Sequence, residues 1–151
     1  MKRTLIMSVL VLTIASLAWG QNVQKKPNLS GTWKLNAEKT DLHGLPAFTM
    51  VQTIKHQNAN FEIGAIVNGK ETSAPKTFEI GGSAVSIDSD DATAKFWWEG
   101  QSLHSEIKWK AGDVQKDIRT LSEDGKTMTD MRTITKPQGF VVKMTLVLEK
   151  Q

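Results

Sequence analysis

Hydrophobic and polar residues alternate along most of the chain beyond residue 30. Within residues 103–110, for example, Leu103, Ile107 and Trp109 alternate with polar side chains. Successive side chains of a β-strand point to opposite faces, so a period of two predicts strands with one apolar face. The pattern predicts about ten strands, at residues 31–36, 48–56, 61–67, 71–80, 83–87, 93–98, 103–110, 114–121, 127–135 and 140–148.

Short turn motifs separate most of these stretches, at intervals of about 9–14 residues that are typical of an all-β sandwich or barrel. Their Gly, Asn and Asp residues adopt the backbone angles of tight hairpins at little steric cost. The motifs are Asn68-Gly69, Gly81-Gly82, Asp88-Ser89-Asp90-Asp91, Glu99-Gly100, Gly112-Asp113, Asp124-Gly125 and Pro137-Gln138-Gly139.

The short connections predict an antiparallel sheet. Only residues 37–47, which contain a possible single helical turn, approach the length that a parallel crossover needs. Pro75 cannot donate a hydrogen bond to a neighbouring strand, which predicts an edge, a bulge or a gap at that point. An antiparallel meander can close as a barrel or fold over as a sandwich. We predict an all-β, up-and-down β-barrel of about eight to ten strands, because few connections are long enough to pass between two sheets.

The N-terminus has the pattern of a secretory signal peptide. Lys2 and Arg3 form a positive region, residues 5–18 form an apolar stretch, and Ala18-Trp19-Gly20 supplies the small residues that a signal peptidase reads. The apolar stretch is shorter than the roughly 20 residues that span a bilayer. We expect cleavage before Gln21, no membrane span, and a secreted or periplasmic protein.

Residues 1–20 are thus a predicted signal peptide, 21–29 a flexible lead-in and 30–150 the barrel domain. Cleavage would leave 17 basic residues against 16 acidic ones, a net charge of +1. Nucleic-acid binding needs a concentrated basic surface, so we expect no nucleic-acid partner. The chain contains no cysteine, which excludes disulfides, thiol catalysis and thiolate-held metals.

The motif Gly31-Thr32-Trp33 resembles the Gly-x-Trp opening of the lipocalins, and also the start of the fatty-acid-binding proteins. In this calycin superfamily the Trp closes one end of an up-and-down barrel. The resemblance implies structural roles for Gly31 and Trp33. Residues 144–150 look like the closing strand of such barrels, and the layout of residues 30–150 resembles small secreted bacterial proteins of lipocalin-like type.

The chain also departs from these families. Lipocalins usually carry a C-terminal helix, and their closing strand often offers an Arg to stack on the Trp; here that strand has only Lys143 and Lys150. Fatty-acid-binding proteins have a helix-turn-helix after the first strand, for which residues 37–47 are too few. Their Arg-x-Tyr carboxylate clamp is also missing, because the chain has no Tyr.

The leading functional hypothesis is that the barrel binds a small apolar or amphipathic molecule. Arg119 or Arg132 would anchor its polar end if either points inward, which would suit an anionic head group; if both point outward, they are ordinary surface residues. The predicted ligand-binding residues are Met50, Ile54, Phe61, Ile63, Phe96, Trp98, Ile107, Trp109, Arg119, Arg132, Val142 and Met144.

A barrel filled by its own side chains would instead favour a protein partner. Such a module, an inhibitor or an envelope accessory factor, would act through an exposed edge, Trp97 or the loop 37–47. Adjacent Trp97 and Trp98 must point to opposite faces, so one of them lies outside, either exposed to a partner or covered by its neighbours. A cavity of a few hundred Å³ inside the barrel would distinguish the two hypotheses.

Catalytic motifs are missing from the sequence. It contains no Gly-x-Ser-x-Gly elbow, phosphate loop or His-Glu-x-x-His motif. His43, His56 and His104 are far apart, and His104 shares a strand face with charged residues, which predicts exposure to solvent. The Asp88-Ser89-Asp90-Asp91 carboxylates could hold a hard cation, or form an ordinary solvated turn. We predict no catalytic residue, no metal site and no cofactor.

Overall fold

The computed structural model describes residues 25–87 and 91–151, and within these ranges it contains ten strands and no helix. The predicted signal peptide and residues 88–90 of the acidic turn lie outside the described residues. The strands are β1 (Gly31–Leu35), β2 (Met50–Gln57), β3 (Asn60–Val67), β4 (Lys70–Glu79), β5 (Val85–Ile87), β6 (Ala92–Glu99), β7 (Ser102–Trp109), β8 (Val114–Leu121), β9 (Thr127–Thr135) and β10 (Val141–Lys150).

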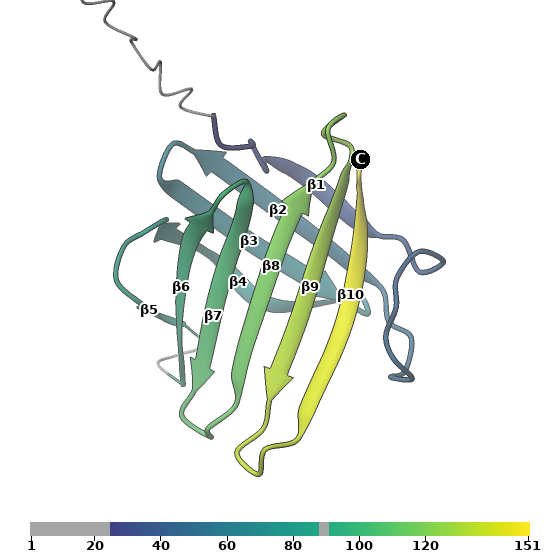
Figure 1. Cartoon of the computed structure of the whole chain (residues 1–151), viewed down its shortest axis with the longest axis vertical. Coiled ribbons are helices and arrows are strands. Elements are labelled where there is room, and N and C mark those ends of the chain that lie inside the picture. Colours follow the sequence, from purple (N-terminus) through teal and green to yellow (C-terminus); the bar gives the residue numbers. More distant parts are fainter. Residues whose placement is uncertain (1–24, 88–90) are drawn as a thin grey trace, which may run out of the picture.

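All ten strands form one antiparallel sheet in the order β4-β3-β2-β1-β10-β9-β8-β7-β6-β5. Strands that follow one another in the chain pair with each other, except β4 and β5, and β1 also pairs with β10, so the first and last strands are joined. Figure 1 shows the sheet curled on itself, with β2 to β4 crossing behind β6 to β8. The prediction of an all-β, antiparallel, up-and-down fold is confirmed.

The described strands form a curled half-barrel, because β4 and β5 are the two edges of the sheet and do not pair. One end of β4 approaches β6, where the amide of Gly81 donates to the Phe96 carbonyl oxygen at 2.7 Å. Elsewhere the ammonium of Lys76 reaches the carbonyl oxygen of Ser86 across the two edges. Pro75 lies in β4 opposite a register shift in β3, as its missing N–H predicts.

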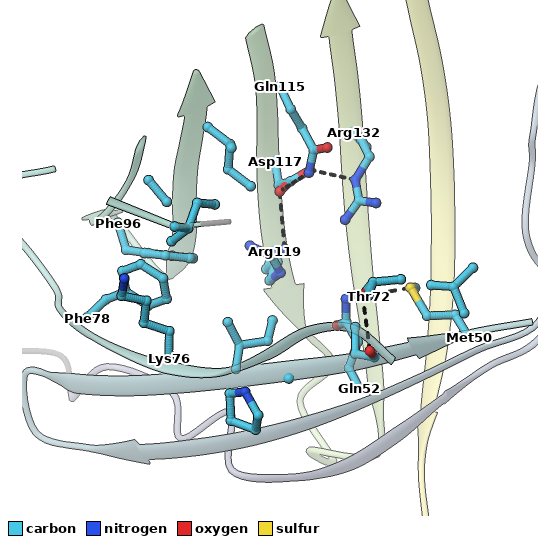
Figure 2. Close-up of a pocket in the computed structure, with 18 of the residues that line it drawn as sticks. Met50, Gln52, Thr72, Lys76, Phe78, Phe96, Gln115, Asp117, Arg119 and Arg132 are labelled. Carbon is cyan, nitrogen blue, oxygen red and sulfur yellow. Dashed lines mark hydrogen bonds and ion pairs between the residues drawn. The ribbon is translucent and has the colours of Figure 1, made fainter. Parts of the chain in front are cut away.

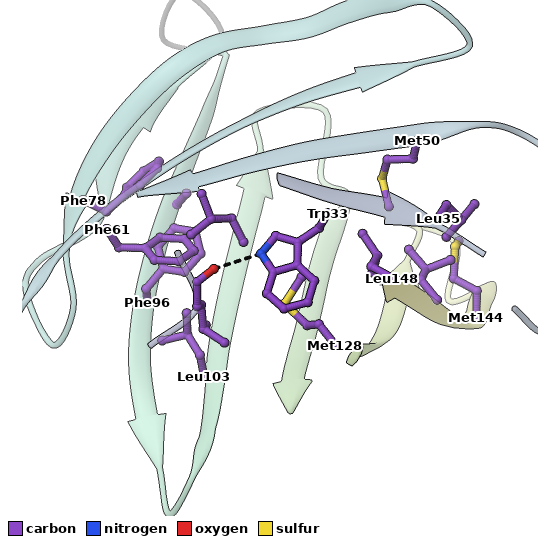
Figure 3. Packing of buried hydrophobic residues seen from close by; sticks show 14 residues of the cluster. Trp33, Leu35, Met50, Phe61, Phe78, Phe96, Leu103, Met128, Met144 and Leu148 are labelled. Carbon is purple, nitrogen blue, oxygen red and sulfur yellow. Dashed lines mark hydrogen bonds between the residues drawn. The ribbon is translucent and has the colours of Figure 1, made fainter. Parts of the chain in front are cut away.

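A hydrophobic core fills one part of the interior (Figure 3). Trp33 is fully buried there, and its indole Nε1 donates to the carbonyl oxygen of Leu29 at 2.9 Å. The Lys150 ammonium lies 5.4 Å from the centre of the Trp33 ring. A side chain at Gly31, whose φ is 144°, would come within 2.6 Å of the Lys150 stem, so glycine is needed where that stem crosses β1.

The connection from β1 to β2 runs along β10 and forms no helix. Its first turn, at residues 37–39, is held by the Asn36 carboxamide oxygen, which accepts from the amides of Glu38 and Lys39. Further along, Asp41 and Thr145 exchange backbone hydrogen bonds. The possible helical turn is therefore replaced by an Asn-stabilised turn and an extra bridge to β10.

Candidate functional site

A cavity of about 760 Å³ occupies the barrel interior (Figure 2). Inward-facing positions of β2, β3, β4 and β6 to β9 supply most of its walls, because every second side chain of a strand faces the same side. The lining residues are Met50, Gln52, Ile63, Gly64, Ala65, Val67, Thr72, Pro75, Lys76, Phe78, Ile87, Ala94, Phe96, Ile107, Trp109, Gln115, Asp117, Arg119 and Arg132.

The residues predicted from sequence to bind a ligand divide between this cavity and the packed core. Seven of them line the cavity: Met50, Ile63, Phe96, Ile107, Trp109, Arg119 and Arg132. Ile54, Phe61 and Met144 are buried in the hydrophobic core, and Val142 packs against that core half-buried. Trp98 lines a separate hollow at the end of the barrel. The cavity is thus displaced away from β10 and toward β3, β4 and β8 relative to the predicted lining.

Two Asp-x-Arg sequences, one on β8 and one on β9, form the polar wall of the interior. The register of the two antiparallel strands places Asp117 opposite Arg132 and Arg119 opposite Asp130. All four side chains face inward, and three of them are at most 4% exposed. We call these four residues the Asp–Arg cluster. Both arginines therefore point into the barrel. The sequence alone had left open whether they point inward or outward.

Each carboxylate of the Asp–Arg cluster contacts both guanidinium groups. Asp117 accepts from Arg132 Nε at 2.7 Å and from Arg119 Nη2 at 3.2 Å. Asp130 Oδ2 accepts from Arg132 Nη2 at 3.1 Å and lies 3.3 Å from Arg119 Nη2. Two basic and two acidic groups alternate in a closed ring, so their charges balance when all four are ionised.

Neutral side chains complete the hydrogen bonding around Asp117. Gln115 Nε2 donates to its carboxylate at 2.8 Å, and the Ser105 hydroxyl donates to Oδ2 at 3.0 Å. Ser105 in turn accepts from Arg119 Nη1 at 3.1 Å. These bonds fix the orientation of both charged groups, since ionised groups make stronger hydrogen bonds than neutral ones.

The two carboxylates of the cluster differ in proton affinity. Burial works to raise the pKa of Asp117, but the charges of Arg132 and Arg119 outweigh burial and lower the pKa to about 2. Burial raises the pKa of Asp130, with the Arg119 charge opposing it. For Arg132, burial works to lower the pKa, and the charges of Asp117 and Asp130 reverse this and raise it. Asp117 and Arg132 are therefore a firmly ionised pair.

Three buried polar atoms have no hydrogen-bond partner within residues 25–87 and 91–151: Arg119 Nε, Gln52 Oε1 and Asp130 Oδ1. Arg119 and Gln52 line the cavity. We call Arg119 Nε and Gln52 Oε1 the open polar atoms; one is a donor and the other an acceptor. A buried polar atom left without a partner costs about 1–3 kcal/mol, so such atoms mark a place where a bound group would be stabilised.

Sequence reasoning missed Gln52, Gln115 and Asp117 in the cavity wall. Gln52 alternates with Met50 and Ile54 on β2, a pattern that already places it on the inward face. The stronger signal was the repeated Asp-x-Arg sequence. The hairpin turn at Asp124-Gly125 brings the two copies into register, so each carboxylate can meet the opposite guanidinium.

A second hollow of about 520 Å³ lies at the end of the barrel beside the lead-in. Trp98 and His56 contribute to its wall, with their rings 5.9 Å apart. Lys26 crosses it, with its ammonium 5.8 Å from the Trp98 ring centre and bonded to the Gly100 carbonyl oxygen. His56 Nδ1 accepts from the Leu29 amide, so this histidine helps to hold the lead-in.

Trp97 is the outward member of the Trp pair, and it is covered by its neighbours. Its ring lies 5.6 Å from that of His104, its Nε1 donates to Glu99 at 2.7 Å, and the Lys95 ammonium is 5.3 Å from its ring centre. The His104 side chain is only 16% exposed. The expectation that His104 is open to solvent was wrong, because Trp97 packs over it from the neighbouring strand.

Comparisons with known proteins show the fold of the chain. No protein-family model matches the sequence, and no curated protein matches it significantly. Among solved structures, secretory abundant heat soluble protein 4 from Ramazzottius varieornatus superposes with a TM-score of 0.63 at 13% identity, covering 85% of this chain and 99% of that one.

Two other solved structures also superpose on this chain. Fatty-acid-binding protein 1 of Echinococcus granulosus has a TM-score of 0.58 at 12% identity, covering 80% of this chain and 96% of that one. Human cRBP IV has a TM-score of 0.57 at 15% identity, covering 83% and 99%. At these identities the likeness shows a shared β-barrel fold.

The described residues offer no group of side chains that could hold a metal ion. No cluster of three or more His, Cys, Asp or Glu side chains lies together there. Within the same residues, no helix is long and apolar enough to cross a membrane. The chemistry that the interior offers is therefore an apolar surface with one wall of fixed, alternating charges and two open polar atoms.

Proposed function

We propose that this protein binds a small amphipathic molecule inside the barrel, with the polar end of the molecule directed to the Asp–Arg cluster. The observation that carries the proposal is the cavity of about 760 Å³, which lies within the range of small-molecule sites. A barrel filled by its own side chains, the premise of the protein-interaction hypothesis, would leave no such space.

The distribution of side chains in the cavity supports an amphipathic ligand. Met50, Ile63, Phe96 and Ile107 offer an apolar surface, and burying an alkyl chain against it would contribute about 0.8 kcal/mol for each methylene. Arg119 and Gln52, the residues that carry the open polar atoms, line the same cavity. Most of such a molecule would thus contact apolar side chains, and a few fixed polar groups would orient it.

The similar structures support the same conclusion by analogy of fold. The protein from Echinococcus granulosus is named for fatty-acid binding, and another similar structure, at a TM-score of 0.58 and 15% identity, is described as a fatty acid transporter. A fold hosts many functions, so the proposal stands on the cavity and its lining. It assigns binding and no catalysis, and places the chain among the lipocalin-like barrels.

Ligand titration of two matched variants tests the proposal. Ala65 lines the cavity, whereas neighbouring Ile66 is exposed on the outer face. We expect Ala65→Phe to abolish binding of dodecyl compounds and Ile66→Phe to preserve it, as followed by intrinsic tryptophan fluorescence, to which cavity-lining Trp109 contributes. Thermal unfolding would verify that both variants fold. Equal binding by the two variants, or no binding by the parent protein, would contradict the proposal.

We also propose that residues 1–20 direct export and are removed. This rests on the charged, apolar and small-residue regions of that segment. The intact mass of the protein recovered from the exported fraction of its host should correspond to a chain beginning at Gln21. A mature protein that keeps Met1 would contradict this expectation.

A further inference from the structure

We infer that the ligand carries an uncharged polar group that both donates and accepts a hydrogen bond, such as a hydroxyl or a carboxamide, and that a carboxylate is disfavoured. This inference rests on the proposed function and specifies its ligand class. It follows from three properties of the cavity: the charge balance of the Asp–Arg cluster, the nature of the open polar atoms, and the position of Lys76.

The charge balance of the cluster removes the attraction for a simple anion. Each guanidinium already contacts two carboxylates at distances of 2.7–3.3 Å. A ligand carboxylate beside Arg119 would therefore lie close to Asp117 and Asp130 as well. It would give up its hydration and meet a site with no net charge to compensate for that loss.

The open polar atoms require two different partners. Arg119 Nε is a donor and needs an acceptor, whereas Gln52 Oε1 is an acceptor and needs a donor. A carboxylate can only accept, so it would leave Gln52 Oε1 without a partner. A hydroxyl or a primary amide carries both functions, and ligands of this kind can satisfy either atom or both.

The remaining cation in the cavity wall lies away from the open polar atoms. Lys76 belongs to the edge strand β4, is exposed, and bonds through its ammonium to the Ser86 carbonyl oxygen. In Figure 2 it lies beside Phe78, apart from Gln115 and Asp117. A carboxylate held by Lys76 would stay near solvent and would leave Arg119 Nε and Gln52 Oε1 without partners. This orientation keeps the cost of both unpaired polar atoms and is disfavoured.

A series of dodecyl compounds with equal chains and different head groups tests the inference. The change in intrinsic tryptophan fluorescence, to which cavity-lining Trp109 contributes, would report the binding of dodecanol, dodecanamide, methyl dodecanoate and dodecanoate to the full mature chain at neutral pH. We expect dodecanol and dodecanamide to bind at least about tenfold more tightly than dodecanoate. Methyl dodecanoate, which only accepts, should lie between them.

A second arm of the experiment locates the head group. Gln52→Leu should weaken the binding of dodecanol several-fold and change that of methyl dodecanoate little. The matched control is Thr53→Leu, at the adjacent exposed position on the outer face, which should leave both affinities unchanged.

Three results would overturn the inference. Dodecanoate could bind as tightly as dodecanol, Gln52→Leu could leave dodecanol binding unchanged, or Lys76→Met could abolish the binding of the whole series and so place the head group at β4. The first two leave the proposed function standing; the third would keep binding inside the barrel but contradict the proposed direction of the polar end. Failure of all four compounds to bind would contradict the proposed function itself.

Discussion

Strands β6 to β9 carry a group of acidic and basic side chains on each of their two faces. The inner group is the Asp–Arg cluster, whose carboxylates are fully buried. The outer group surrounds Glu106, whose carboxylate lies 3.1 Å from Lys108, 3.2 Å from Lys95 and 3.9 Å from Lys116. The lysine side chains of this outer group are 44–65% exposed.

The two groups differ in their exposure to water and in how firmly their side chains are held. Water screens the outer lysines, and exposed ion pairs of this kind contribute about 0–1 kcal/mol. Inside, each ion depends on the three others for compensation, so removing one leaves a buried charge unpaired. The inner group has two acidic and two basic side chains, and the outer group has one acidic and three basic ones. Only the inner group can orient a ligand, because its members are held in fixed positions beside a cavity.

Breaking the inner group should have the largest effect on stability. Asp117→Ala leaves Arg132 and Arg119 without their shared carboxylate and should lower the free energy of unfolding by about 3–5 kcal/mol, measured by urea denaturation. Replacing Asp117 and Arg132 together by Leu removes a whole ion pair and should cost less than Asp117→Ala alone. A larger loss in the double variant would contradict the compensation argument.

The two carboxylates of the inner group should affect the stability of the protein differently as the pH is lowered. The pKa of Asp117 falls from its ordinary value of 3.8 to about 2 on folding, so its stabilising contribution, about 2 kcal/mol, is present above pH 4 and is lost as pH falls toward 2. Asp117→Asn should therefore flatten the acid limb of the stability curve.

Asp130 should behave in the opposite way. Its pKa is raised by burial, so the folded state binds this proton more tightly and gains relative stability as pH falls through the raised pKa. Asp130→Asn removes that gain and should make the acid limb steeper. Denaturation midpoints measured between about pH 2 and pH 6 would show whether the two variants change the slope in opposite directions, and a change of the same sign in both would contradict these assignments.

Breaking the outer group should have the smallest effect. Glu106→Gln should lower stability by about 1 kcal/mol or less, and this difference should shrink further in high salt. The pKa of Glu106 is lowered, since Lys108 and Lys95 outweigh the opposing effect of burial. A loss of stability comparable to that of Asp117→Ala would show that ion pairs on the two faces contribute equally, and would contradict the comparison.

The strands and their antiparallel order could be predicted because the signals are local. Alternation defines each strand, and the turn motifs, such as Asn68-Gly69 and Asp124-Gly125, join neighbours. Pro75 also marked the irregular edge correctly. The open seam between β4 and β5 could not be read from such signals, since the Gly81-Gly82 turn looks like any other hairpin turn while its flanking strands stay unpaired.

The inward direction of the arginines was not predictable from hydrophobic alternation, because β8 and β9 invert it. Ile118 and Met131 lie between the charged residues and face outward, with Met131 49% exposed. The charges are stable inside only because the cross-strand register pairs Asp117 with Arg132 and Arg119 with Asp130. That register is a tertiary property, and a single strand read alone suggests the opposite orientation.

The direct test of the account is the nuclear magnetic resonance signal of the Arg119 Nε–H group during titration with dodecanol. Beyond residue 20 the chain contains only two arginines, Arg119 and Arg132, so Arg119→Lys and Arg132→Lys would assign both signals. The Arg132 Nε–H already donates to Asp117, whereas Arg119 Nε is an open polar atom. The account predicts a large shift of the Arg119 signal and a small one of Arg132. Saturable binding of dodecanol with an unchanged Arg119 signal would contradict it.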